Sequence, residues 1–524
     1  MRPSLRAALL VVSAAGPAAA QRGAAAPAMP RDFDAYVTHA LQQFHVPGLA
    51  IAVVKDGRTI FAKGFGVRRL GDPTPVDAHT LFQIASNTKA FTDAVIAMLV
   101  DSGRISWDDP VQKYLPWFQL ADPWVTREFT IRDLVTHRSG LGLGAGDLVW
   151  YHSDYSAEEV VRHLRAARPV TSFRSAYAYD NVLYIAAGLV IESVTGKPWS
   201  QNIRERIFAP LQMTEATTDI GAFLRPGADA AAPHGWVDGQ VRVVPRDTID
   251  NTLAAGGIIA NVTDLAKWMT VQLDSGRTAG GRLWSPREAQ EMWSPQTILG
   301  IGTPPPALAA LRANFAAYGL GWFLRDYRGR KIASHTGGLS GMTSQTTLVP
   351  DERLGIVILT NGESGIFQAL TYRLLDHFLG APATDWAGIE SRLQDADRVR
   401  GDSIERAQGA SRDSLSRPSL APARYAGTYR DALYGDATIA SENGGLVLRF
   451  SHSPAFVGDL VHWQYDTYVA RWRTRNLADA FVTFTLNPDG SIDSFRMAAV
   501  SPLADFSFDY QDLAFRRTGG PPDK

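Results

Sequence analysis

The most constraining feature of the sequence is a long helical, Gly-punctuated stretch, about residues 80–275, enclosed between strand signals. Apolar, β-rich runs lie on both sides of it, at 48–54 and 59–65, and then at 319–324, 343–349 and 355–359. The first two runs flank Asp56-Gly57, a typical hairpin turn. Strands from both ends of the chain around a helical block favour one shared sheet with helices segregated around it. We therefore predict an α+β fold, an antiparallel sheet flanked by helices with a helical subdomain.

The chain also carries more than one folded unit. Its 524 residues exceed the roughly 250–300 residues at which single hydrophobic cores stop growing. Apolar residues at helical spacing from Phe33 to Phe44 predict an amphipathic helix near the start of the first unit, 32–385. Residues 386–421 are polar and charged with few large apolar side chains, which predicts a partly helical linker. Closely spaced short strand signals then predict a small all-β barrel at 422–517, followed by a tail at 518–524.

The first twenty residues have the three-part pattern of a secretory signal peptide. Arg2 and Arg6 precede an apolar run, and the small residues Ala18-Ala19-Ala20 precede Gln21. The apolar run is far short of the ~20 residues that a membrane span needs, and no later segment is long and apolar enough to be transmembrane. We expect cleavage after residue 20, a flexible segment at 21–31, and a periplasmic or secreted mature protein.

Charge and cysteine content exclude several classes of function. The formal net charge is −1, and the chain has no long basic or acidic run. Nucleic acids and anionic membrane surfaces both require a concentrated cationic patch, so we expect neither as the main partner. The chain has no cysteine, which excludes disulfides, thiolate metal sites and a cysteine nucleophile. A small-molecule or peptide partner remains.

The sharpest local signal is Ser86-Asn-Thr-Lys89 at the start of an apolar helical pattern. The spacing of three residues places the hydroxyl and the amine on one helix face, one turn apart. A serine hydroxyl needs a neighbouring base to become a nucleophile, and a desolvated lysine can serve. The N-terminus of the helix favours negative charge developing on a substrate carbonyl oxygen. A tetrapeptide of this kind also occurs by chance in most chains of this length.

Two further signals have both a chemical and a structural interpretation. Tyr179-Asp-Asn181 precedes a strongly apolar helix, so the phenol and amide either act on a substrate or only cap that helix. His335-Thr336-Gly337-Gly338 precedes a strand signal, and its glycines either let a substrate backbone approach closely or form a plain turn.

Together, in this order and separation, the three signals resemble the serine β-lactamase and D,D-peptidase superfamily, in its class C-like branch with family VIII esterases and S12-type peptidases. Further stretches look similar, namely 130–141, 207–213, 254–258 and 264–266. The resemblance implies an acyl-enzyme on Ser86, with Lys89 accepting or sharing its proton and Tyr179 acting as general base and later as proton donor.

The resemblance also implies the surrounding site. Asn181, His335, Thr336 and Gly337 would bind the substrate, and the backbone N–H groups of Ser86 and Gly338 would form the oxyanion hole. The family context makes His137 a structural loop residue. Neither a metal nor an organic cofactor is implied. The expected function is an exported serine hydrolase for a small ester, amide or peptide.

One departure from the family pattern bears on the substrate. The third element reads His335-Thr336-Gly337, where typical β-lactamases have lysine in the first position. A histidine carries only part of a charge near neutral pH, so it binds a substrate carboxylate less firmly than lysine does. The alternatives that stay open are a β-lactamase and a penicillin- or peptide-binding sensor that acylates without turnover. The 422–517 region resembles an appended lipocalin-like domain, which could cap the site, mediate oligomers or bind a hydrophobic ligand.

Overall fold

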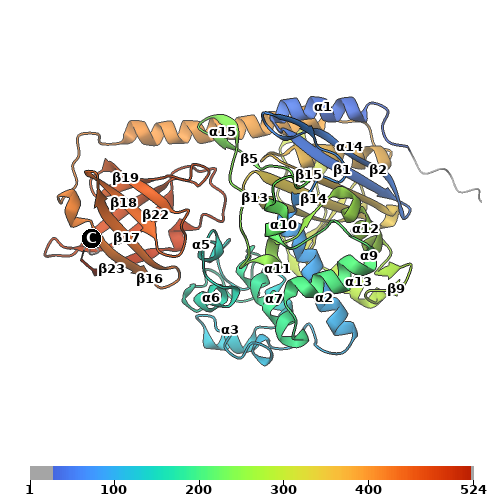
Figure 1. Ribbon diagram of the computed structural model, residues 1–524, viewed down its shortest axis with the longest axis horizontal. Coiled ribbons are helices and arrows are strands. Elements are labelled where there is room, and N and C mark those ends of the chain that lie inside the picture. The colour runs from blue at the N-terminus through green and yellow to red at the C-terminus, as the bar shows by residue number, and fades with distance from the viewer. Residues whose placement is uncertain (1–27, 521–524) are drawn as a thin grey trace, which may run out of the picture.

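The computed structural model describes residues 28–520, in two units joined along one edge by the long helix α15 (Trp386–Ser411) (Figure 1). The predicted signal peptide lies outside the described residues. Helix α15 occupies most of the predicted linker, and its first turn belongs to the N-terminal unit. Trp386 is fully buried there, and its indole donates a hydrogen bond to Asp376 Oδ2 at 2.8 Å.

A nine-stranded antiparallel sheet forms the centre of the N-terminal unit, in the order β10-β11-β12-β13-β14-β15-β1-β2-β3. The strands are β1 (Gly48–Lys55), β2 (Arg58–Arg69), β3 (Asp72–Pro75), β10 (Thr297–Ile298), β11 (Ala316–Tyr318), β12 (Phe323–Tyr327), β13 (Arg330–Leu339), β14 (Met342–Val349) and β15 (Leu354–Thr360). Strand β1 pairs with β15, which confirms that both ends of this unit share one sheet. Asp56 and Gly57 have φ angles of 52° and 76°, as the predicted hairpin turn requires.

The strand predicted at 319–324 is only partly confirmed. Phe323 and Leu324 begin β12, whereas residues 319–322 make the turn between β11 and β12, which Gly319 N closes by donating to Trp322 O at 2.7 Å. Gly321 has a φ of 74°, and a Cβ atom there would lie 2.7 Å from Ala90 Cα. Apolar residues are common in this segment because its side chains are buried, not because it is extended.

Two apolar layers cover the two faces of the sheet, and β1 shows the division. Leu49, Ile51 and Val53 pack with helices α1 (Phe33–Phe44) and α14 (Ile366–Phe378). The residues between them face the second core, which contains α2 (Thr88–Asp101) and α12 (Val262–Leu273). A strand buried on both faces reads as a continuous apolar run, which explains the sequence pattern of 48–54.

The helical subdomain lies against the second face of the sheet. Its other helices are α3 (Pro123–Glu128), α4 (Ile131–Leu134), α5 (Asp147–Trp150), α6 (Ala157–His163), α7 (Val182–Thr195), α8 (Trp199–Ile203), α9 (Ala209–Leu211), α10 (Ile220–Leu224), α11 (Leu253–Gly256) and α13 (Pro286–Met292). Short strand pairs connect them, β4 (Phe82–Gln83) with β7 (Ile259–Ala260), β5 (His234–Val237) with β6 (Gln240–Val243), and β8 (Arg277–Thr278) with β9 (Gly281–Arg282). No helix within 28–520 combines the length and apolar character needed to cross a membrane.

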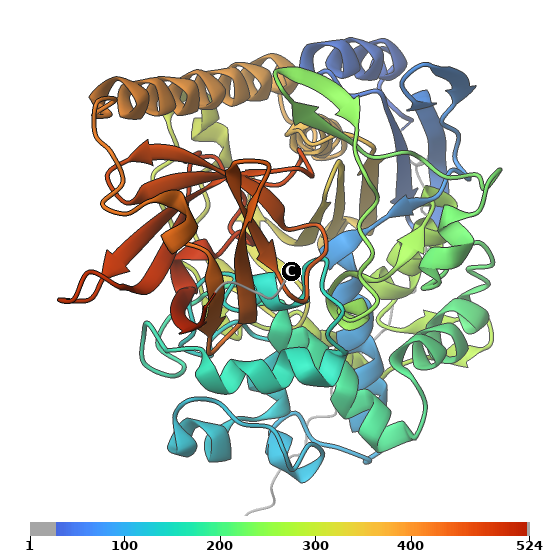
Figure 2. The ribbon, with the colours of Figure 1, turned by 60° about the vertical axis from the view of Figure 1, so that its left-hand side comes forward.

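The C-terminal unit is the predicted all-β barrel, closed by eight antiparallel strands (Figure 2). The strands are β16 (Gly427–Asp431), β17 (Gly435–Glu442), β18 (Gly445–Phe450), β19 (Val457–Gln464), β20 (Thr467–Trp472), β21 (Ala480–Leu486), β22 (Ile492–Ala499) and β23 (Ala514–Gly519), and β16 pairs with β23. Buried aromatic rings pack inside it, and the centroids of Tyr434 and Phe450, and of Phe495 and Phe515, are 4.7 Å apart. The core of this barrel is therefore filled by its own side chains.

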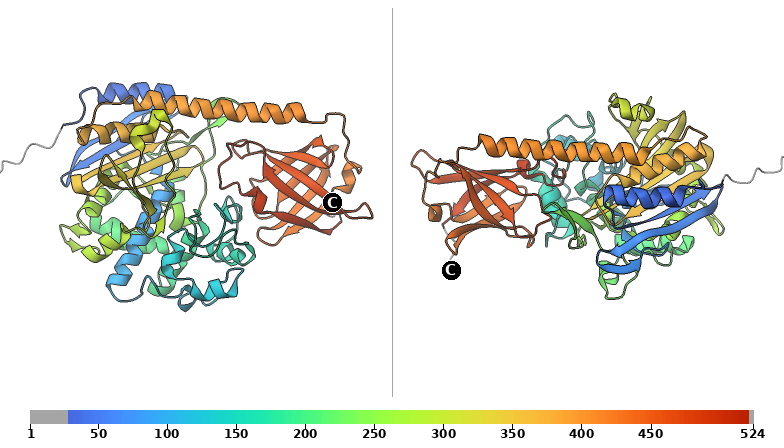
Figure 3. Two further views of the ribbon diagram at one scale, coloured as in Figure 1. Left: turned by 180° about the vertical axis from the view of Figure 1, so that it is seen from behind. Right: turned by 90° about the horizontal axis from the view of Figure 1, so that it is seen from above.

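The barrel is packed against the helical subdomain (Figure 3). The Tyr155 ring, between α5 and α6, stacks on His452 of the barrel with 4.0 Å between centroids. The Tyr155 hydroxyl donates to Tyr434 O at 2.9 Å, and His452 O accepts from Asp154 N at 2.9 Å. Buried apolar residues of the two units form one continuous cluster. The barrel thus has a fixed place beside the site described next.

Candidate active site

Ser86 lies in a tight turn where a 3-10 segment, Ala85–Asn87, leads into α2. Ala85, directly before it, has a φ of 49°, a conformation that costs a residue with a side chain about 1 kcal/mol or more. The turn is held against β13, where a Cβ atom on Gly337 would lie 2.2 Å from Ile84 O and 3.0 Å from Ala85 Cβ. Only glycine at 337 lets the strand approach the turn that presents Ser86.

Lys89 lies on the first turn of α2 and is fully buried. Its Nζ is 3.0 Å from Ser86 Oγ, 2.7 Å from Asn181 Oδ1 and 3.0 Å from Ala255 O. The amide and carbonyl oxygens can only accept, so they take two N–H groups and leave the third direction of Nζ toward Ser86. Burial lowers the pKa of Lys89 to about 7. A neutral amine therefore exists near neutral pH, with its lone pair facing the serine hydroxyl.

Tyr179 and Asn181 occupy the turn before α7, with Asn181 at the N-cap position. Tyr179 lines the same pocket as Ser86, and Lys89 Nζ lies 4.7 Å from the centroid of its ring. Burial raises the pKa of Tyr179 well above its usual value, so this phenol keeps its proton at neutral pH. In the resting site Lys89 is the better proton acceptor and Tyr179 the better proton donor.

His137 supports this turn. Its Nδ1 accepts a hydrogen bond from Asp180 N at 3.1 Å, and its carbonyl oxygen accepts one from Ala178 N at 2.9 Å. The imidazole lies 4.3 Å from the Tyr179 ring, centroid to centroid. Burial lowers the pKa of His137 well below its usual value, so it is neutral. These contacts match a structural role.

His335 lies on β13 and is also buried and neutral. Its Nδ1 is 2.6 Å from Thr336 O, an acceptor, and therefore carries the proton. Its Nε2, 3.1 Å from the Tyr318 hydroxyl, accepts. Burial lowers the pKa of His335 to about 3. The expectation of a partial positive charge here near neutral pH is wrong, because tertiary packing removes the solvent that would stabilise it.

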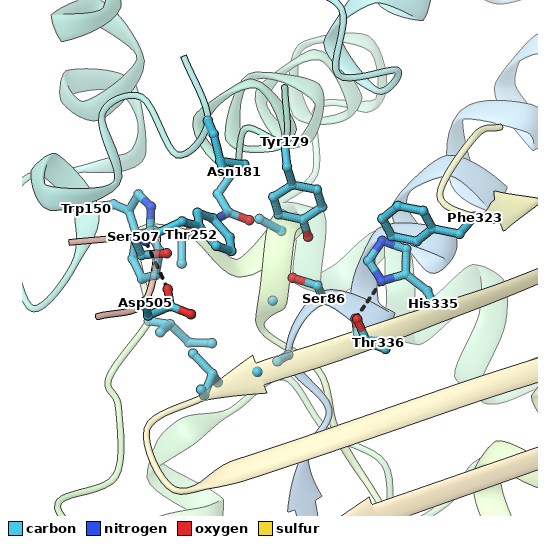
Figure 4. A pocket seen from close by; sticks show the side chains of 18 of the residues that line it. Ser86, Trp150, Tyr179, Asn181, Thr252, Phe323, His335, Thr336, Asp505 and Ser507 are labelled. Carbon is cyan, nitrogen blue, oxygen red and sulfur yellow. Dashed lines mark hydrogen bonds between the residues drawn. The ribbon is translucent and has the colours of Figure 1, made fainter. Parts of the chain in front are cut away.

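The predicted residues meet in a pocket of about 350 Å³ (Figure 4). The Tyr179 hydroxyl points toward Ser86, and His335 and Thr336 lie beside these two residues, with 6.2 Å between the ring centroids of Tyr179 and His335. Gly338 lines the pocket, and no heavy atom lies within 4 Å of the position of a Cβ there, whereas Gly337 faces the Ser86 turn and does not line it. Much of the wall is apolar, namely Leu143, Trp150, Ile249, Phe323, Leu339 and Phe506.

Residues that the sequence reasoning missed complete the pocket. Asp505, Phe506 and Ser507 reach it from the barrel, and no local motif marks them. Asp147 lies beneath Asn181, whose amide nitrogen is 3.2 and 3.0 Å from its two carboxyl oxygens. An isolated acidic residue between Gly144-Ala-Gly146 and Leu-Val-Trp150 was the one available signal. Within 28–520, no group of three or more His, Asp or Glu side chains is placed to hold a metal ion.

Comparison with known proteins divides the chain into the same two units. The Beta-lactamase family model matches residues 33–379, and a domain of unknown function, DUF3471, matches 411–517. Unguisins hydrolase ungD' of Aspergillus campestris is 29% identical over 429 residues, covering 78% of this chain and 77% of its own.

Two solved structures share the fold. The octameric penicillin-binding protein homologue from Pyrococcus abyssi has a TM-score of 0.60 at 20% identity, covering 92% of this chain and 99% of its own. A D-stereospecific amidohydrolase from Streptomyces sp. has a TM-score of 0.51 at 24% identity, covering 66% of this chain and 99% of its own. The latter similarity covers a smaller part of this chain.

Proposed function

The chain belongs to the Beta-lactamase family, and from this premise we propose that it is an exported serine hydrolase that cleaves a small ester, amide or peptide through an acyl-enzyme on Ser86. One observation carries the proposal. Lys89 Nζ, held by Asn181 Oδ1 and Ala255 O, lies 3.0 Å from Ser86 Oγ. The Aspergillus campestris relative is named as a hydrolase, which supports turnover over binding alone.

The geometry supports a sequence of proton transfers. Neutral Lys89 takes the Ser86 proton as Oγ attacks the substrate carbonyl, and the backbone N–H groups of Ser86 and Gly338 stabilise the oxyanion. Tyr179 donates its proton to the departing alcohol or amine and regains one from the lysine ammonium. Water then attacks the acyl-enzyme and gives its proton to Lys89, while Tyr179 donates a proton to the departing Ser86 Oγ and regains one from the lysine ammonium, which restores the resting site.

The charges in the pocket favour acyl groups without a carboxylate. His335 is neutral, and the Lys89 amine is fully buried. Among the residues that line the pocket, Asp505 carries a carboxyl group. An anionic substrate would meet apolar walls and a like charge, both unfavourable. This supports a neutral, hydrophobic ester or amide over a β-lactam, whose carboxylate needs a cation.

A substrate panel tests the proposal. Purified protein is assayed with p-nitrophenyl esters, D-amino acid peptides and a chromogenic cephalosporin. We expect sustained release from neutral esters or amides and little from the cephalosporin. Ser86→Ala should abolish turnover, whereas Ser102→Ala, at the far end of α2, should leave it unchanged. A single stoichiometric burst would instead identify a sensor that only acylates, and preferential cephalosporin hydrolysis would identify a β-lactamase.

Export is the second part of the proposal, and it rests on the sequence of residues 1–20. Intact-mass measurement of protein secreted by a bacterial host should give a chain that starts at Gln21, in the periplasm or the medium. A chain that retains residues 1–20 would contradict it.

A further inference from the structure

The barrel reaches the active-site pocket through the segment between β22 and β23. Asp505, Phe506 and Ser507 line the same pocket as Ser86, and Phe506 packs edge-on against Tyr179 with 5.7 Å between ring centroids. These residues lie beyond 33–379, the region that the Beta-lactamase family model matches. The pocket is therefore built by two separate units of the chain.

Two residues of this segment hold the turn that carries Asp147. Ser507 Oγ donates to Asp147 Oδ2 at 2.8 Å. The Asp509 carboxyl oxygens accept from Gly146 N at 3.0 Å and from Leu148 N at 3.2 Å, the two backbone neighbours of Asp147. Gly146 has a φ of 82°, so the turn depends on an unusual backbone conformation that these contacts stabilise. The barrel thus fixes both the side chain and the backbone of Asp147.

Asp147 in turn sets the orientation of the Asn181 amide. A carboxylate only accepts hydrogen bonds, so the amide nitrogen of Asn181 must face Asp147, and its oxygen then faces Lys89 Nζ at 2.7 Å. A flipped amide would present N–H groups to the lysine and compete for its lone pair. Trp150 Nε1, which donates to Asp147 Oδ1 at 2.7 Å, fixes the carboxyl group from the other side.

We propose that Ser507 and Asp509 make the barrel part of the catalytic centre, as positioning residues that act through Asp147 and Asn181 on Lys89. The chain of contacts runs Ser507 Oγ, Asp147, Asn181, Lys89 and Ser86, with each step at 2.7–3.2 Å. The inference rests on the proposed function in one respect, because it takes Lys89 as the acceptor of the Ser86 proton.

The buried charges around Asp147 predict how this link appears in a pH profile. Lys89, Tyr179, Asp180 and Asp509 are ionisable groups that face it, and Tyr179 stays neutral because burial raises its pKa well above its usual value. Burial raises the pKa of Asp147 to about 6, that of Asp180 to about 8, and that of Asp509 well above its usual value. Asp147 is therefore the carboxyl group of the three that is mostly ionised at pH 7, and its charge raises the pKa of Lys89.

The direction of the shift follows. Ser507 stabilises the ionised form of Asp147, so Ser507→Ala raises the pKa of that carboxyl group. Less negative charge then acts on Lys89, so the pKa of Lys89 falls. Because the reaction needs neutral Lys89, the rise of the labelling rate on the acid side of the pH profile moves to lower pH. We expect a shift of about half a pH unit together with a roughly tenfold loss of rate at the optimum, the scale of a lost hydrogen bond to a charged group.

The test uses the full chain and a reagent that needs no natural substrate. A fluorophosphonate forms a bond between Ser86 Oγ and phosphorus and expels fluoride, and the hydroxyl proton passes to Lys89. Its second-order rate is measured by intact mass between pH 5 and 9 for the wild type, Ser507→Ala and Ser507→Thr. Ser501→Ala is the matched control, since Ser501 belongs to the same segment but does not line this pocket. We expect slow, shifted labelling of Ser507→Ala, recovery in Ser507→Thr, and wild-type labelling of the control.

Asp147→Asn supplies a second variant. It removes the charge directly, so its acid limb should move in the same direction and further, and adding Ser507→Ala to it should change the limb no more. Ser507→Ala that labels at the wild-type rate with the wild-type pH profile would overturn the inference and leave the proposed function intact. A wild-type protein that is not labelled at Ser86 would refute the proposed function, and the inference with it.

Discussion

Replacing Lys89 with methionine should inactivate the protein and yet stabilise it at neutral pH. Methionine keeps the length and apolar stem of lysine and removes the amine. Lys89 is fully buried, and its pKa falls from an ordinary 10.5 to about 7. Since one pKa unit corresponds to about 1.4 kcal/mol, the folded state carries about 5 kcal/mol of unfavourable free energy below pH 7 for holding this group.

Two pH-independent losses offset part of that gain. Without the amine, Asn181 Oδ1 and Ala255 O lose a donor, at about 1–3 kcal/mol each. The two losses together amount to about 2–6 kcal/mol, so the expected net gain in the free energy of unfolding of Lys89→Met at pH 7 centres on about 1 kcal/mol.

The change of this gain with pH tests the assignment more directly than its value at one pH. Between the folded pKa of about 7 and the unfolded pKa of 10.5, the unfolded wild type binds more protons than the folded one, so wild-type stability rises with pH. The advantage of Lys89→Met should shrink by about 2 kcal/mol from pH 7 to pH 9.

Denaturant unfolding at pH 7, 8 and 9 measures this. Lys197→Met, which removes a partly exposed lysine paired with Glu205, is the control and should keep a constant difference from the wild type. A constant difference for Lys89→Met would mean that the lysine is charged at neutral pH and does not act as the base.

Two further predictions concern β13. Because the pKa of His335 lies near 3, matched neutral and anionic esters should give parallel pH profiles of kcat/KM between pH 5 and 8, and divergence near pH 6.5 would show that His335 meets substrate charge. Gly337→Ala should destabilise the protein by about 3 kcal/mol, since its Cβ would lie 2.2 Å from Ile84 O, whereas Gly338→Ala should keep wild-type stability and lose kcat/KM because its Cβ enters the pocket. Equal melting temperatures for the two variants would contradict this assignment.

Local patterns in the sequence were sufficient where local geometry decides the outcome. The three-residue spacing of Ser86 and Lys89 places both on one helix face whatever surrounds them. The hairpin at Asp56-Gly57 follows from residues that adopt positive φ, and the apolar run 48–54 follows from burial on both faces of the sheet. The same logic failed at 319–322, where apolar side chains are buried from a turn and only the neighbouring helix explains why Gly321 is needed.

The sequence by itself therefore determined the family, the α+β sheet, the barrel and the candidate residues that we propose to react. The tertiary structure alone decided their protonation and their partners. Burial makes His335 neutral and brings the pKa of Lys89 near 7, and no spacing in the chain encodes the loss of water that causes this. Ser507 and Asp147 are 360 residues apart in the chain. Such a contact depends on how two units pack, because a hydrogen bond across that separation has no local pattern to predict it.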